Sequence, residues 1–123
     1  MRTYIMVLFI LSALIPAWAH EGETHSTPAP YKVLMGELVD TSCYLTHDSK
    51  GKEHKACALT CVNDGAPISL LDKMGKVTLL IPHHNTTIHK QLKDLLAENV
   101  EITGEWAEKC GIKVFVVYSV KKR

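Results

Sequence analysis

The sequence is poor in aromatic residues and has no excess of charge of one sign. It contains two Trp, two Phe and four Tyr, and its 14 Lys and Arg are balanced by 13 Asp and Glu. A balanced chain generates no strong field that would attract nucleic acid or an anionic membrane. Because there are also few rings to stack on bases, we do not expect nucleic-acid binding.

The residue patterns of common enzymes are absent as well. The sequence has no Ser, His and Asp set for nucleophilic catalysis, no glycine-rich phosphate loop and no pair of acids with a suitable spacing. An ordinary hydrolase or transferase is therefore not expected. The one enzyme class that we consider is a thiol oxidoreductase, because the chain contains four Cys.

Only one long apolar run occurs, and it lies at the N-terminus. Arg2 precedes an apolar stretch over residues 4–15, and Ala17-Trp18-Ala19 follows. These are the three parts of a secretory signal peptide, and the apolar stretch is too short to span a bilayer. We predict cleavage after Ala19 and a soluble periplasmic or secreted protein with no stable membrane insertion. An uncleaved N-terminal anchor is the alternative.

The remainder of the chain is predicted to form a flexible leader over residues 20–30 and one domain over residues 31–123. The polar stretch 41–51 is predicted to be a loop. The predicted strands cover 31–40, with a bend or bulge at Gly36, and 68–71, 76–81, 99–106 and 112–120, and the predicted helices cover 53–62 and 86–96. This mainly β order, with two helices, is typical of a five-stranded OB-like small barrel. An open α+β sheet is the alternative.

Five residues able to bind a soft metal are concentrated between positions 43 and 61. On a helix, Cys57 and Cys61 are one turn apart on the same face, and His54 lies three residues before Cys57. Cys43 and His47 lie on the preceding segment, which is long enough to fold back over the helix. Thiolates and imidazoles that converge bind zinc or copper(I), so we predict a copper or zinc site from these five residues.

Three further residues have weaker assignments in this prediction. Asp40 is expected to orient a ligating His rather than to bind the ion itself. If cleavage makes His20 the N-terminus, its α-amine and imidazole can chelate copper(II) with His25 nearby, although chance His residues in a flexible leader are the simpler interpretation.

The oxidising compartment into which the chain is predicted to be exported also permits disulfides. A bond from Cys43 to Cys57 or Cys61 would give a structural or interaction domain that binds an exported protein partner and no metal. A thiol redox protein is the third interpretation. Cys110 would pair with a remaining thiol only if its turn lies near the helix.

The cysteine-containing segment resembles a family of small secreted bacterial domains of unassigned function. Such domains share a Gly-x-x-x-Asp-x-x-Cys start and a His-x-x-Cys-x-x-x-Cys-x-x-x-Gly block. The matching residues are Gly36, Asp40, Cys43, His47, His54, Cys57, Cys61 and Gly65, and the stretch 100–104 is also similar. The resemblance implies an exported β-barrel-like domain in which these Cys and His residues act as a unit. It implies no activity, and Cys110 departs from its pattern.

Overall fold

The computed structural model describes residues 30–84 and 86–123. The predicted signal peptide, its cleavage site after Ala19, most of the predicted leader, His20 and His25 lie outside these residues. Within the described ranges, no helix has both the length and the apolar character required to cross a membrane.

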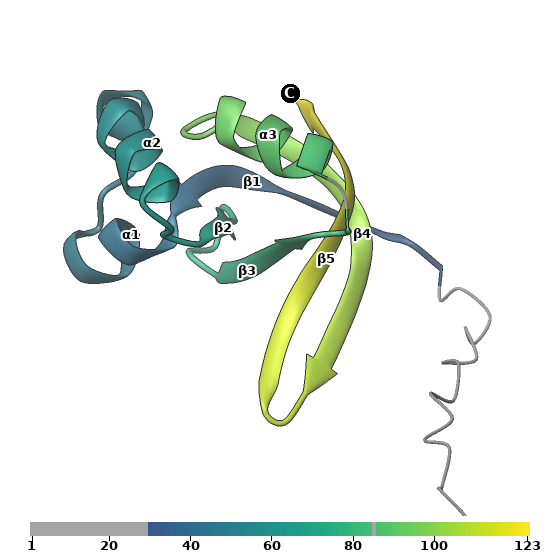
Figure 1. Cartoon of the computed structure of the whole chain (residues 1–123). Coiled ribbons are helices and arrows are strands. Elements are labelled where there is room, and N and C mark those ends of the chain that lie inside the picture. The colour runs from purple at the N-terminus through teal and green to yellow at the C-terminus, as the bar shows by residue number, and fades with distance from the viewer. Residues whose placement is uncertain (1–29, 85) are drawn as a thin grey trace, which may run out of the picture.

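Five strands form a mainly β structure in which each strand pairs with two others (Figure 1). They are β1 (Lys32–Asp40), β2 (Ile68–Leu71), β3 (Val77–Pro82), β4 (Asn99–Lys109) and β5 (Ile112–Lys122). The pairing order is β1-β2-β3-β5-β4, and β4 returns to β1, so the strands close into a ring. Only the β3–β5 pair is parallel among the described pairs. The predicted five-stranded, mainly β class is confirmed.

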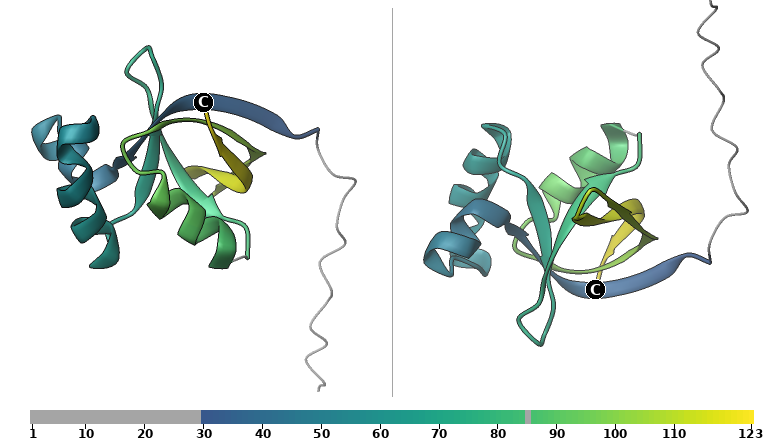
Figure 2. Two further views of the ribbon diagram at one scale, coloured as in Figure 1. Left: turned by 90° about the horizontal axis from the view of Figure 1, so that it is seen from above. Right: turned by 90° about the horizontal axis from the view of Figure 1, so that it is seen from below.

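The described residues contain three α-helices rather than the predicted two. They are α1 (Thr41–His47), α2 (Lys55–Asn63) and α3 (Thr86–Asp94), and a short 3-10 turn, η1 (Lys52–His54), precedes α2. The loop predicted over 41–51 is confirmed for residues 48–51 but wrong for residues 41–47, because Asp40 Oδ1 accepts a hydrogen bond of 2.9 Å from the backbone N–H of Ser42 and caps a helix there. Figure 2 shows α1 and α2 together on one side of the ring.

The apolar core lies inside the ring and extends to α2 and α3. Its largest members are at most 1% exposed: Leu38, Leu92, Leu96, Ile102 and Phe115. Ile88 joins Leu92 from α3 in this core. The helix α3 connects β3 to β4, two strands that are not neighbours in the ring, and it covers the core on the way.

Two glycines allow close backbone approach between neighbouring strands. A Cβ atom on Gly36 would overlap the carbonyl oxygen of Leu71, and one on Gly104 would overlap that of Val116. The pairing of β1 with β4 runs through Gly36 without a register shift, and β1 pairs with β2 from Glu37 onward. Of the bend or bulge predicted at Gly36, the bulge is therefore wrong, and a register shift lies instead in the β4–β5 pair, between Thr103 and Gly104.

Candidate metal site

Core packing fixes the orientation of α2 and of its two cysteines. Ala58 and Val62, one turn apart, are 3% and 5% exposed and belong to the apolar core. Cys57 and Cys61 each precede one of these residues, so a rotation of about 100° per residue places both thiols at the edge of the buried face. Cys61 is half-buried there and Cys57 is exposed.

The end of β1 fixes the orientation of α1 and of Cys43. Asp40 is fully buried and pairs with Ile68 of β2. The next residue, Thr41, donates its N–H to the carbonyl of Pro67 at 3.0 Å, and its hydroxyl is hydrogen-bonded to that of buried Ser69 at 2.7 Å. Cys43 follows Asp40 by three residues, and this helical spacing places its thiol on the same side as the Asp40 carboxylate.

Two groups of three side chains bring potential ligand atoms together, and both groups include Cys43. One group adds His54 and Cys57, and the other adds Asp40 and Cys61. Within each group the ligand atoms lie within 4.8 Å of one another. The two sulfur atoms of Cys43 and Cys61 are 3.6 Å apart. We call the five residues of these two groups the Cys43 cluster.

The Cys43 cluster contains four of the five ligands predicted from the sequence, and it adds Asp40. Cys57 and Cys61 share a helix but fall into different groups, so it is Cys43 that connects them. His47 lies in the last turn of α1, is exposed, and belongs to neither group in the described part of the chain. From the sequence, Asp40 was expected to orient a ligating His and not to bind the ion. Its spacing of three residues from Cys43 nevertheless indicated that both side chains face one site.

Cys110 is separate from the Cys43 cluster. It is exposed and lies between Lys109 and Ile112, in the turn that joins β4 to β5. Figure 1 shows this hairpin extending away from α1 and α2, so the condition for its pairing with a helical thiol is not met. All four cysteines lie in the described ranges and carry free thiols.

Each group of the Cys43 cluster contains a buried polar atom with no hydrogen-bond partner among the described residues. These atoms are Oδ2 of Asp40 and Nε2 of His54. A buried polar atom without a partner costs about 1–3 kcal/mol, so native proteins rarely retain one without a compensating contact. Carboxylate oxygen, imidazole nitrogen and thiolate sulfur are all zinc ligands. The donor set and its two unpartnered atoms therefore fit a metal ion.

The thiols beside Asp40 are held in their protonated form. The Asp40 carboxylate beside Cys43 is the main cause that raises the pKa of Cys43 to about 12. The hydrogen bond with Cys43 lowers the pKa of Cys61, but burial and Asp40 outweigh it, so this pKa is also raised. Protonated thiols are poorer nucleophiles than thiolates, so the raised pKa makes Cys43 and Cys61 less reactive as free thiols. Coordination to a cation deprotonates such thiols.

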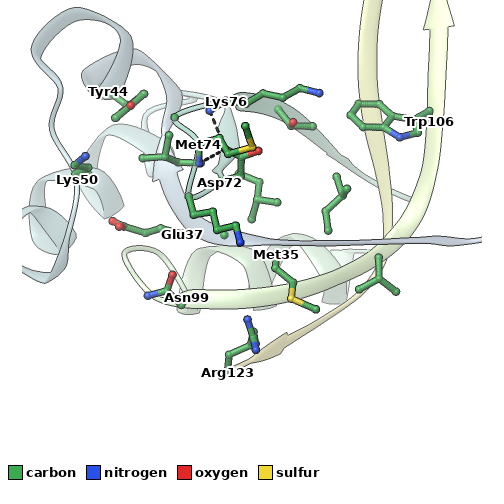
Figure 3. Close-up of a pocket in the computed structure, with 18 residues that line it drawn as sticks. Met35, Glu37, Tyr44, Lys50, Asp72, Met74, Lys76, Asn99, Trp106 and Arg123 are labelled. Carbon is green, nitrogen blue, oxygen red and sulfur yellow. Dashed lines mark hydrogen bonds between the residues drawn. The ribbon is translucent and has the colours of Figure 1, made fainter.

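A separate groove of about 770 Å³ crosses the outer side of β1 and the β2–β3 turn. Figure 3 shows Met35 and Met74 on its two sides and Trp106 at one end, with Tyr44 and Lys50 at the other. Its apolar surface is interspersed with charged side chains of both signs. No motif in the sequence indicated this groove, because its residues come from segments far apart in the chain.

Comparison with protein-family models, with curated proteins and with solved structures finds no match for this chain. A functional assignment therefore depends on the chemistry of the site.

Proposed function

We propose that this chain is an exported domain that binds a soft or borderline metal ion, zinc or copper, and holds it or hands it on. The proposed ligands are Asp40, Cys43, His54, Cys57 and Cys61. The observation that carries the proposal is that Asp40 and His54, whose buried Oδ2 and Nε2 have no hydrogen-bond partner among the described residues, belong to the groups built around Cys43. Export is inferred from the signal peptide predicted over residues 1–19 and from the family resemblance.

We further propose that the fold is an OB-like small barrel. The strand order β1-β2-β3-β5-β4, the parallel β3–β5 pair and the position of α3 between β3 and β4 support this assignment. In such a barrel the Cys43 cluster would occupy the connection between the first two strands. Connections between strands commonly carry binding residues because the rigid sheet positions them.

The experiment that tests metal binding compares two cysteine variants of the full chain. Cys43→Ser removes the residue shared by both groups, whereas Cys110→Ser removes an exposed thiol outside them. Each protein is purified from its export compartment, and its zinc and copper contents and its titratable thiols are measured. We expect stoichiometric metal in the original chain and in Cys110→Ser, and a loss of most of it in Cys43→Ser.

The same measurements separate the alternatives. A chain with no zinc or copper and two fewer titratable thiols than its four cysteines would overturn the metal proposal in favour of a disulfide-stabilised domain. The short distance between Cys43 and Cys61, 3.6 Å between sulfur atoms, makes this pair the one to examine by mass spectrometry. In that case the groove beside Met35 and Trp106 is the surface on which to look for an exported protein partner.

A further inference from the structure

The Cys43 cluster is too extended for one ion to contact all of its ligand atoms. Zinc–ligand distances of about 2.0–2.3 Å keep the ligands of one ion within about 4.6 Å of one another. In this cluster, ligand atoms that all lie within a comparable distance of one another, 4.8 Å, occur as two groups of three and not as one group of five. Cys43 is the only residue common to both groups. The arrangement is therefore that of two adjacent sites with a shared thiol.

The unpartnered polar atoms follow the same division. The group of Cys43 with His54 and Cys57 contains the unpartnered Nε2 of His54, and the group with Asp40 and Cys61 contains the unpartnered Oδ2 of Asp40. A single ion placed in either group would leave the polar atom of the other group unsatisfied. Because Asp40 is fully buried, solvent does not relieve its unpartnered oxygen.

We infer that the Cys43 cluster binds two zinc ions that are bridged by the thiolate of Cys43. Besides Cys43, one ion is bound by His54 and Cys57, and the other is bound by Asp40 and Cys61. This inference rests on the proposed metal-binding function and specifies the number of ions and their division among the ligands. Each ion has three ligands from the chain, and its fourth position is left for water or an exchanging ligand.

Charge balance favours two divalent ions over the other occupancies. With its thiols deprotonated, the cluster provides three thiolates and one carboxylate, and hence four negative charges. Two Zn²⁺ ions neutralise this charge. One Zn²⁺, which deprotonates only the two thiols of its own group, leaves one negative charge in the cluster, and two copper(I) ions leave two, which is costly beside the buried Asp40. Copper(I) also prefers sulfur and nitrogen to the carboxylate oxygen of Asp40.

The test is a zinc titration of the reduced, metal-free full chain in the presence of a chromophoric chelator. We expect two zinc ions per chain. Cys57→Ala and Cys61→Ala should each retain one ion, and Cys43→Ala should lose tight binding of both. Cys110→Ala is the matched control and should retain two. Circular dichroism of each variant verifies that it remains folded.

Cobalt(II) in place of zinc tests the bridge in the unaltered chain, so this arm does not depend on the folding of a variant. Two cobalt ions bridged by one thiolate have coupled spins, so the paramagnetic resonance signal per ion should fall as the second equivalent is added. Two equivalents without coupling would overturn the bridge. One zinc per chain, lost in both Cys57→Ala and Cys61→Ala, would overturn the two-ion site but leave the proposed function intact. No bound zinc or copper would overturn both.

Discussion

Replacing Asp40 with Asn should raise the stability of the metal-free protein and reduce the stabilisation that zinc adds. Asn is as good a helix cap as Asp, so the hydrogen bond from Ser42 to Oδ1 is retained. The substitution replaces Oδ2, which is buried and has no partner among the described residues, with an amide. The carboxylate buries a charge, whereas the amide is neutral and can donate a hydrogen bond to the sulfur of Cys43 or Cys61, so we expect the free energy of unfolding of metal-free Asp40→Asn to rise by about 1 kcal/mol.

Zinc should stabilise the variant less than the original chain because one ligand is lost. Zinc at 100 times its dissociation constant stabilises a folded protein by about 2.7 kcal/mol. A tenfold weaker affinity, which corresponds to about 1.4 kcal/mol of binding energy, reduces this increment to about 1.4 kcal/mol. For a domain of this size, about 1 kcal/mol changes the Tm by about 4–8 °C. The zinc-dependent rise in Tm should therefore be about 5–10 °C smaller in Asp40→Asn.

Thermal unfolding followed by circular dichroism, with and without zinc, measures both effects. Asp72→Asn is the matched control, because Oδ1 of Asp72 also accepts backbone hydrogen bonds, at 2.8 Å from Met74 and 2.9 Å from Lys76. Asp72 lies outside the Cys43 cluster, so its zinc increment should equal that of the original chain. If Asp40→Asn destabilised the metal-free protein and kept the full zinc increment, Asp40 would be a helix cap and not a ligand.

Two further predictions concern the strands. Gly104→Ala would force a Cβ atom against the carbonyl oxygen of Val116 and should lower the free energy of unfolding by about 1–3 kcal/mol in a urea titration; an unchanged midpoint would contradict the close approach. The Tyr118 hydroxyl donates a 2.6 Å hydrogen bond to Glu105, and this contact is the main cause that raises the pKa of Tyr118 to about 12 from 10.0. Because the folded-state pKa is the higher one, the stabilisation is complete below pH 10 and is lost as the pH rises towards 12. Glu105→Gln should move the tyrosinate absorbance titration back towards pH 10, and an unchanged titration would exclude the carboxylate as the cause.

The strands and two of the helices could be predicted because their patterns are local. The β-branched run 112–120 lies within β5 (Ile112–Lys122), and the predicted helix 53–62 overlaps α2 (Lys55–Asn63). By contrast, α1 (Thr41–His47) contains no buried residue, so it has no apolar stripe to reveal it. Its helical conformation is favoured at its start by the cap from Asp40 and at its end by Asp48, which has a left-handed backbone conformation.

The residue types of the candidate site could be predicted, but their division into two groups could not. Spacing along a helix brings Cys57 and His54 together, and this pair does occur in one group. Which partner each thiol meets depends on how α1 is placed against α2. That placement depends on hydrogen bonds from Thr41 to Pro67 and Ser69, which are more than 25 residues away in the sequence. Spacing alone carries no information about these contacts.

The framework that holds the Cys43 cluster does not depend on the metal for its core. Small zinc domains unfold without their ion because they have little else to bury. Here the core is built from the inner faces of the strands with α2 and α3, and it includes none of the proposed ligands. Asp40 lies on a paired strand, and the cysteines of α2 adjoin Ala58 and Val62, which anchor that helix. The donors are thus positioned before an ion arrives, and exposed Cys57 is the ligand most accessible for exchange. These features suit a domain that takes up and releases metal while remaining folded.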